Sequence, residues 1–581
     1  MNKQHLYITL LLVTILLPVC KVLAQTKPIG KEVEVTRPYD PDVVEAQKIW
    51  YDPTVNPDSI KAKDLSYSVM PKSIASDFTI SPIASANLIE MNRNEPRFGY
   101  VRAGVGYKPS TLLDFYVSNN NAKTVVLGLY ANHRGFWGDV TLENELAEKD
   151  VAANNMSNNV GIFVRKPFSA ATFSVNADYS GKRFLRYGYD PSWFNTPYNG
   201  VYSKDSVLQT NNLFNVNLQI ESTPGSNEVE YMATTSFQYF YDHYDMQETA
   251  ISLAGMLGKQ LTDEHKLAVY IGATGYNRNT LLDTTGGNFL FNVNPYYMYA
   301  SGDFSARLGL LFVGDQYGDG ESKSYAYPAI SASYRITDFL VPTVELRGET
   351  EVNSYRKLAE ECMYITPGLA NFGSVHSTQK FRNTYHRIMG IFSLKGDVGT
   401  SLSYNLYGSF SKIENLVLFV NQPVWASPLR FTNNIEVAYD NGWKYTVGGE
   451  IRFDMKPVSV YARAAYNSYS LDTYKKALHR PGFEANLTAS YKYDSWVFSA
   501  TFDMALDRYY MWQDPLSSSM MVTSYHKLDN IYNLGVGAEY LFNKNFSVFA
   551  NLQNLLNKRY DTFYQYSVPG TMLYGGITYR F

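Results

Sequence analysis

Apolar and polar residues alternate with a period of two through most of the chain after residue 98. The stretch 496–506, WVFSATFDMAL, puts Trp, Phe, Ala, Phe, Met and Leu on one parity and Val, Ser, Thr, Asp and Ala on the other. Alternate residues of a β-strand point to opposite faces, so this pattern predicts a strand with one apolar face. The same alternation recurs in 445–453, 534–542, 546–553 and 573–581.

The segments between the predicted strands are short and long in turn. The short ones are 223–226, 262–265, 301–303, 337–338, 395–399, 456–457, 494–495 and 543–545. The long ones include 134–158, 183–210, 353–380, 470–481 and 511–525. Short turns on one rim and long loops on the other are typical of outer-membrane barrels. We therefore predict an all-β fold: a transmembrane antiparallel β-barrel of about 22 strands over residues 98–581, with about 20 strands as the alternative.

The last predicted strand reaches the end of the sequence, GTMLYGGITYRF, residues 570–581. A closed barrel has no free edge, so its last strand must pair with its first. We expect this strand to form the closing seam.

The N-terminus carries the longest apolar run, LYITLLLVTILLPV, residues 6–19. Lys3 precedes it and the small-residue site Val22-Leu23-Ala24 follows, which predicts a secretory signal peptide, 1–24, cleaved before Gln25. The run is too short for a spanning helix. A lipoprotein signal at Cys20 is the alternative, but Val19 stands where such signals need a small residue. We expect export to the cell outer membrane.

Composition narrows the class of protein further. The net charge of −3 gives no reason to expect a nucleic-acid partner. After cleavage Cys362 is the single cysteine, so no internal disulfide can form. The 49 Tyr and 32 Phe residues suit a protein with membrane interfaces, where a tyrosine ring meets both lipid and water. The lipid bilayer is thus the first partner we predict.

Residues 25–97 have a different character, with frequent prolines and little alternation. Proline at this density prevents long helices and central strands. We predict a short Pro-rich arm that lies in the periplasm or in the lumen of the barrel.

The stretch NLQNLLNKRYDTF, residues 551–563, resembles the segment before the last strand of TonB-dependent outer-membrane receptors. Together with the strand count, this resemblance covers about residues 98–581 and implies solute uptake through a large barrel. The family places a plug domain before the barrel, whereas the arm 25–97 is short for a full plug and lacks the Gly-rich plug strand. An unplugged barrel of this size would leak solutes, so the arm, the loops or a partner protein must close it.

KEVEVTRP, residues 31–38, loosely resembles the TonB box of that family, and a plain extended strand is the favoured alternative. The residues of a partner-binding arm would be Glu32, Val33, Glu34, Val35 and Thr36.

Five charged residues on the polar parity of predicted strands are candidate lumen-lining groups: Glu450, Arg452, Asp503, Asp507 and Glu539. Facing water or each other, they avoid the cost of charge in lipid. They would form lumenal salt bridges, which we favour, or tune the passage of a solute.

Catalytic groups are not indicated. His243, with Asp242 and Asp245, resembles a water-activating pair, but such residues are ordinary in interface loops. A Ser–His pair for a barrel lipase is not excluded, but nothing favours it. The acidic, Gly-rich stretch 314–322 does not have the spacing of a known Ca²⁺ loop, and a solvated turn is favoured there. We expect no enzyme, no metal and no cofactor.

Two functions stay open on the sequence alone. The first is solute uptake across the outer membrane, as the family resemblance implies. The second is a non-transporting barrel subunit that binds other outer-membrane or periplasmic proteins.

Overall fold

The computed structural model describes residues 98–581, except 120–123, 144–147, 189–206, 224–228, 244, 280–285, 366–379, 424–432 and 515–521. The predicted signal peptide, 1–24, and the predicted arm, 25–97, lie outside these residues and stay predictions, as do the arm's partner and the missing plug.

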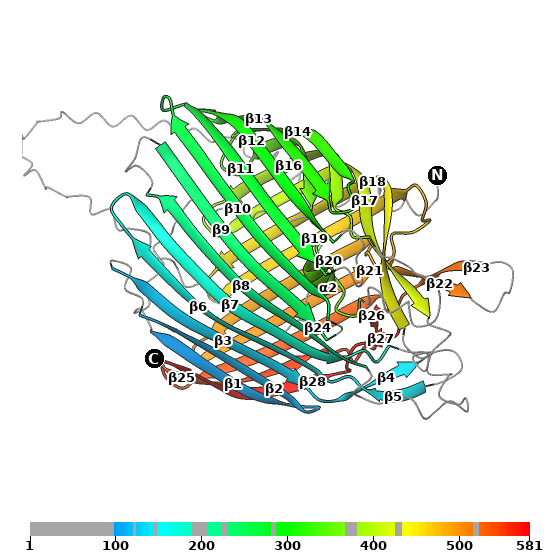
Figure 1. Ribbon diagram of the computed structural model, residues 1–581. Coiled ribbons are helices and arrows are strands. Elements are labelled where there is room, and N and C mark those ends of the chain that lie inside the picture. The colour runs from blue at the N-terminus through cyan, green and yellow to red at the C-terminus, as the bar shows by residue number, and fades with distance from the viewer. Residues whose placement is uncertain are drawn as a thin grey trace, which may run out of the picture. The chain divides into compact units, whose positions relative to one another are not determined.

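One sheet of 22 strands makes up most of the described chain (Figure 1). Its first eleven strands are β1 (Gly99–Tyr107), β2 (Ser110–Ser118), β3 (Val126–Phe136), β6 (Asn155–Pro167), β7 (Ala171–Leu185), β8 (Leu208–Ser222), β9 (Val229–Asp242), β10 (Gln247–Gln260), β11 (His265–Arg278), β12 (Gly287–Ser301) and β13 (Phe304–Tyr317). The other eleven are β14 (Ser322–Tyr334), β15 (Val341–Glu351), β16 (Thr384–Val398), β17 (Leu402–Pro423), β18 (Asn433–Met455), β19 (Val458–Leu471), β20 (Phe483–Tyr493), β21 (Trp496–Leu506), β24 (Ile531–Leu541), β25 (Phe546–Gln553) and β28 (Met572–Arg580).

Each strand pairs antiparallel with the next strand of this sheet along the chain, and the ring closes between β1 and β28. At the seam Tyr100 lies opposite Arg580 and Tyr107 opposite Leu573. The predicted barrel, its strand number and its closing strand are confirmed.

The outer face of the barrel is apolar, as the alternation predicts. On β18, Tyr445, Val447 and Ile451 are exposed, and Val447 keeps 64% of its surface accessible. Thr446 and Glu450, on the opposite parity, are buried. Exposed apolar side chains around a closed sheet match a wall that lipid surrounds. The described helix is too short and too polar to span a membrane.

The two rims differ. The turn rim, where the ends of β1 and β28 meet residue 98 and Phe581, carries the short connections. The opposite loop rim carries the hairpins β4 (Asp139–Glu143)–β5 (Glu148–Ala152), β22 (Tyr509–Asp514)–β23 (Val522–Lys527) and β26 (Asp561–Phe563)–β27 (Tyr566–Ser567), and the helix α2 (Tyr355–Glu361). Figure 1 shows these elements at the end of the barrel away from the C-terminus. The predicted division into short turns and long loops is therefore correct.

Candidate functional site

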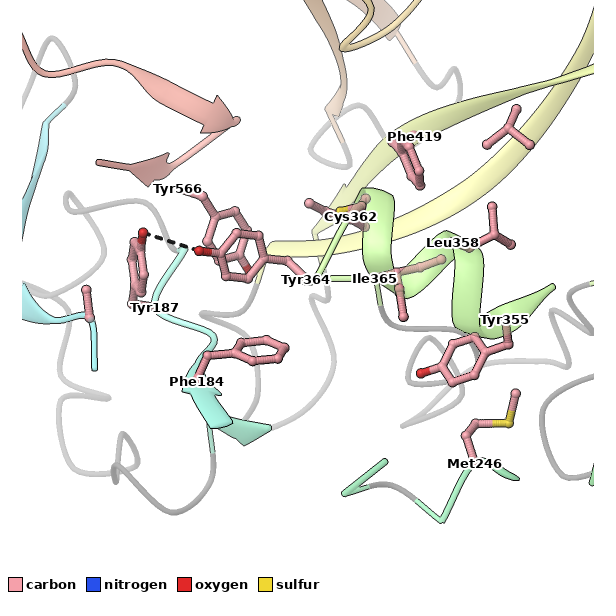
Figure 2. Packing of buried hydrophobic residues seen from close by; sticks show 14 of the residues in the cluster. Phe184, Tyr187, Met246, Tyr355, Leu358, Cys362, Tyr364, Ile365, Phe419 and Tyr566 are labelled. Carbon is pink, nitrogen blue, oxygen red and sulfur yellow. Dashed lines mark hydrogen bonds between the residues drawn. The ribbon is translucent and has the colours of Figure 1, made fainter. Parts of the chain in front are cut away.

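The loop rim holds a packed apolar core that the sequence alternation does not predict, here called the mouth cluster (Figure 2). Its buried members come from β4–β5, the end of β7, the β9–β10 turn, α2 and its flanks, β17–β18 and β27. They are Val140, Leu142, Val151, Ala153, Phe184, Tyr187, Phe240, Met246, Tyr355, Leu358, Ala359, Cys362, Tyr364, Ile365, Phe381, Val417, Phe419, Ile435 and Tyr566.

These segments start from opposite sides of the barrel. β7 is the fifth strand around the ring and β18 the sixteenth, so they are as far apart as two strands can be in a ring of 22. Nevertheless, the Asn433 backbone N–H, at the start of β18, donates to the Gly188 carbonyl, just beyond β7, over 2.9 Å. The chain therefore crosses the mouth of the barrel above the lumen.

Further contacts reinforce this crossing. Ile365, after α2, forms a parallel bridge with Ile435 of β18. Tyr364 stacks on Tyr566 with ring centroids 3.6 Å apart, as Figure 2 shows. The Tyr187 hydroxyl donates to the Ser567 carbonyl over 2.8 Å. Buried aromatic rings with satisfied hydroxyls give both packing energy and fixed geometry.

Helix α2 is anchored to the inner wall through its first turn. Ser354 caps it by accepting from the Lys357 N–H. The Glu248 carboxylate of β10 accepts from the backbone N–H groups of Tyr355 and Arg356, over 2.8 and 3.2 Å. It also accepts from Arg278 Nε of β11 over 2.8 Å, in an ion pair whose side chains are 1% and 3% exposed. One buried carboxylate thus holds both the wall and the helix.

A second set of polar contacts secures the segment that follows α2. Asp315 of β13 accepts from Asn383 Nδ2 over 2.6 Å and from the Tyr385 hydroxyl over 2.7 Å. The Arg278 guanidinium donates to Asn288, which donates to Asp315, so the two anchors form one chain of hydrogen bonds. Buried polar groups of this kind are costly unless paired, and here pairing fixes the loop against the wall.

A second group of loop residues joins the β26 segment to β17. Arg508 is fully buried and donates to the carbonyls of Asp529, Asp561 and Thr562. His479 Nδ1 donates to the Phe419 carbonyl over 2.9 Å. Burial, and next the Arg508 charge, lower the pKa of His479 to about 3, so its imidazole is neutral.

Cys362 lies at the end of α2 inside the mouth cluster and is completely buried. Burial raises the pKa of its thiol well above the usual range. This thiol is therefore unreactive while the cluster stays packed, and it reports on the cluster's opening.

The comparisons with known proteins concern the fold. No protein-family model matches the sequence, and no curated protein matches it. The structure is similar to the ferric enterobactin receptor PfeA from Pseudomonas aeruginosa, with a TM-score of 0.59 at 11% identity over 83% of this chain and 81% of that one. It is also similar to the siderophore receptor PirA from Acinetobacter baumannii, with a TM-score of 0.60 at 12% identity over 83% and 80%. The copper transporter OprC gives 0.57 at 12% identity over 83% and 80%.

The chain shares the barrel fold of these receptors. All three are receptors or transporters by name, and none of them is an enzyme. At this level of identity the likeness concerns the barrel and carries over no individual residue.

Four of the candidate lumen charges, all except Asp507, lie on inward-facing positions of this barrel. Glu450 is buried and accepts from Asn405 and the Tyr461 hydroxyl, both over 3.2 Å. Asp503 accepts from the amides of Asn486 and Asn533. Glu539 pairs with Arg580 over 2.6 Å.

Arg452 and Asp507 lie near the two rims. Arg452 is largely exposed near the turn rim and pairs with Asp454 over 2.6 Å. Asp507 follows the end of β21 with a φ of 56°, so the strand alternation does not extend to it. It pairs with Lys527 on the loop rim over 2.6 Å. The five residues do not form one ladder and do not meet at one place.

The remaining candidates have structural partners in the described part of the chain. Asp242 accepts from the Tyr355 hydroxyl over 2.6 Å and so belongs to the anchor of α2. Asp319, in the acidic stretch 314–322, pairs with Lys380 and Arg382, and the hydrogen bond from Arg382 lowers its pKa to about 2. Within the described ranges no group of three or more acidic, His or Cys side chains is placed to hold a metal ion.

Sequence reasoning missed the mouth cluster and the anchor Glu248–Arg278. A signal was present in SYRKLAEE, residues 354–361, where a capping Ser precedes a short helical pattern inside a predicted loop. The pairing of that helix with a wall carboxylate more than a hundred residues earlier has no local signature.

Proposed function

We propose that the protein is an outer-membrane uptake barrel whose loops gate the mouth. The crossing of the mouth between opposite strands, Gly188 to Asn433, is the observation that carries this proposal. A wide barrel with such a crossing does not admit solutes freely, so passage requires the loops to move.

The likeness to receptors for ferric siderophores and to a copper transporter supports uptake rather than free diffusion. In this proposal a solute binds at the loop rim, the mouth cluster opens, and the solute passes along the polar inner wall. Glu450, Asp503 and Glu539 would line this route. The solute class suggested by the neighbours is a metal ion or its chelate.

The packed mouth also favours a second function, a closed barrel subunit of an outer-membrane complex. Nineteen residues are buried in the cluster, a large core for loops that must separate. A barrel that never opens would use its loop rim as a docking surface for partner proteins.

Planar-bilayer recording of the purified full-length protein separates the two functions. We expect the wild type to be closed and Glu248→Gln, which weakens the anchor of α2, to show open-channel currents. Cells with this variant should also become permeable to large antibiotics. Uptake is wrong, and the subunit function is established, if two results occur together. Cys362 becomes reactive in the variant without any current, and a partner protein co-purifies in stoichiometric amount.

A further inference from the structure

The outward face of the barrel carries polar side chains in one sector near the loop rim. His133 of β3 shares its parity with the exposed Leu127 and Leu129, so it points away from the lumen. Its Nε2 lies 2.7 Å from the Thr111 hydroxyl of β2 and its Nδ1 2.7 Å from Asn158 Oδ1 of β6. Polar groups on a lipid-facing wall are expensive unless they have a partner or meet a lipid headgroup.

This polar row lies near the loop rim, the level at which lipid headgroups would meet a barrel of this kind. His133 is close to the loop-rim end of β3, and Thr111 and Asn158 are close to the corresponding ends of β2 and β6. Further from the rim the same face is apolar, with Leu129, Val160 and Ile162 exposed. With distance from the loop rim, the outward face therefore changes from polar to apolar, as a lipid does from its headgroup to its acyl chains.

A groove begins at His133 and continues onto the seam strands. It has a volume of about 570 Å³, and its lining includes Ala103, Leu113, His133, Trp137, Gly575 and Ile577. The small residues Ala103 and Gly575 leave a hollow in the wall between bulkier neighbours. The open, mostly apolar shape suits an acyl chain lying along the barrel.

Trp137 lines both this groove and a second hollow of about 210 Å³. The second hollow is lined by Asn154, Asn155 and Arg183, among others. Arg183 is exposed near the end of β7, directly opposite Met156, and makes no ion pair with any residue that the structure describes. An outward guanidinium at headgroup depth attracts phosphate.

We propose that this sector, between β28 and β7, is a binding site for a phosphorylated lipid of the outer leaflet. Its phosphate is held by Arg183, its headgroup contacts Trp137 and the His133 row, and an acyl chain fills the groove over Ala103 and Gly575. This site lies on the outer wall and is independent of passage through the lumen.

Native mass spectrometry of the full-length protein, titrated with lipid A and with lipid A stripped of its phosphates, tests this site. We expect the wild type to prefer the phosphorylated form about fivefold, the factor that one basic side chain at a membrane surface supplies. Arg183→Gln should abolish this preference. Lys166→Gln is the matched control, because Lys166 is an exposed cation on the outward face of β6 near the turn rim, stacked on Phe168.

Gly575→Leu tests the groove separately. A Cβ there meets only the Phe549 carbonyl oxygen, at 3.9 Å, so the variant should fold, which heat-modifiable migration on gels verifies. Filling the groove should weaken both forms of lipid A. Any of three results would overturn the proposal. The wild type binds the two forms of lipid A equally, Arg183→Gln and Lys166→Gln have equal effects, or a protein is bound in place of lipid. If Gly575→Leu does not fold, the comparison of Arg183→Gln with Lys166→Gln still tests the proposed lipid site.

Discussion

The Glu248 carboxylate offers the sharpest perturbation of the mouth. Glu248→Gln keeps the shape and one acceptor oxygen but removes the negative charge that faces the buried Arg278 guanidinium. Removing one partner of a buried pair costs about 3–5 kcal/mol. Because the amide oxygen can still accept from the first turn of α2, we take the lower end, about 3 kcal/mol.

That loss raises the population of the opened mouth cluster about a hundredfold. Cys362 reports the change, since its thiol reacts with a maleimide only when the cluster opens. We predict that labelling in isolated outer membranes is about a hundredfold faster in Glu248→Gln than in the wild type. Glu221→Gln is the control, because Glu221 forms a long, exposed pair with Arg165 near the turn rim. An increase below tenfold, or an equal one in the control, would refute the view that Glu248 anchors α2.

Three further predictions concern packing and charge. Leu358→Ala, at a fully buried position of α2, should destabilise the mouth cluster by about 2–5 kcal/mol without unfolding the barrel, seen as faster exchange of loop-rim amides only. His479 should weaken the second group of loop residues, around Arg508, by about 2 kcal/mol when the pH falls from 7 to 5, because the opened state takes up a proton on His479 below its usual pKa of 6.5 while the packed state does not above about 3. Because His479→Gln lacks only this contribution, the wild type should lose about 2 kcal/mol more than the variant over this pH range. Asp507→Asn should change stability by less than about 0.5 kcal/mol, since its pair with Lys527 is half exposed, and urea titration of the folded protein measures this.

The sequence predicts the barrel well because a closed wall imposes a simple rule at every strand. The alternation in 496–506 and 573–581 reflects lipid on one side and lumen on the other, and the turn lengths reflect the two rims. Asp507 shows where the rule stops: one residue beyond β21 the backbone turns with positive φ, and parity no longer gives direction.

The candidate site was much harder to predict from the sequence. The mouth cluster unites residues from strands that are opposite in the ring, such as Phe184 and Ile435, and no local pattern encodes which loops meet. The Glu248–Tyr355 contact likewise joins residues 107 positions apart. Only the closed ring, which brings all loops to one rim, makes these contacts available.

The central claim is that the chain crosses the mouth of the barrel, and the amide of Asn433 tests it most directly. Its N–H donates to Gly188 from the opposite wall. Hydrogen exchange of the full-length protein at neutral pH, resolved to this amide, should show protection comparable to that of the neighbouring barrel strands. Exchange at the rate of an open, solvated loop would contradict the crossing and, with it, a gated mouth.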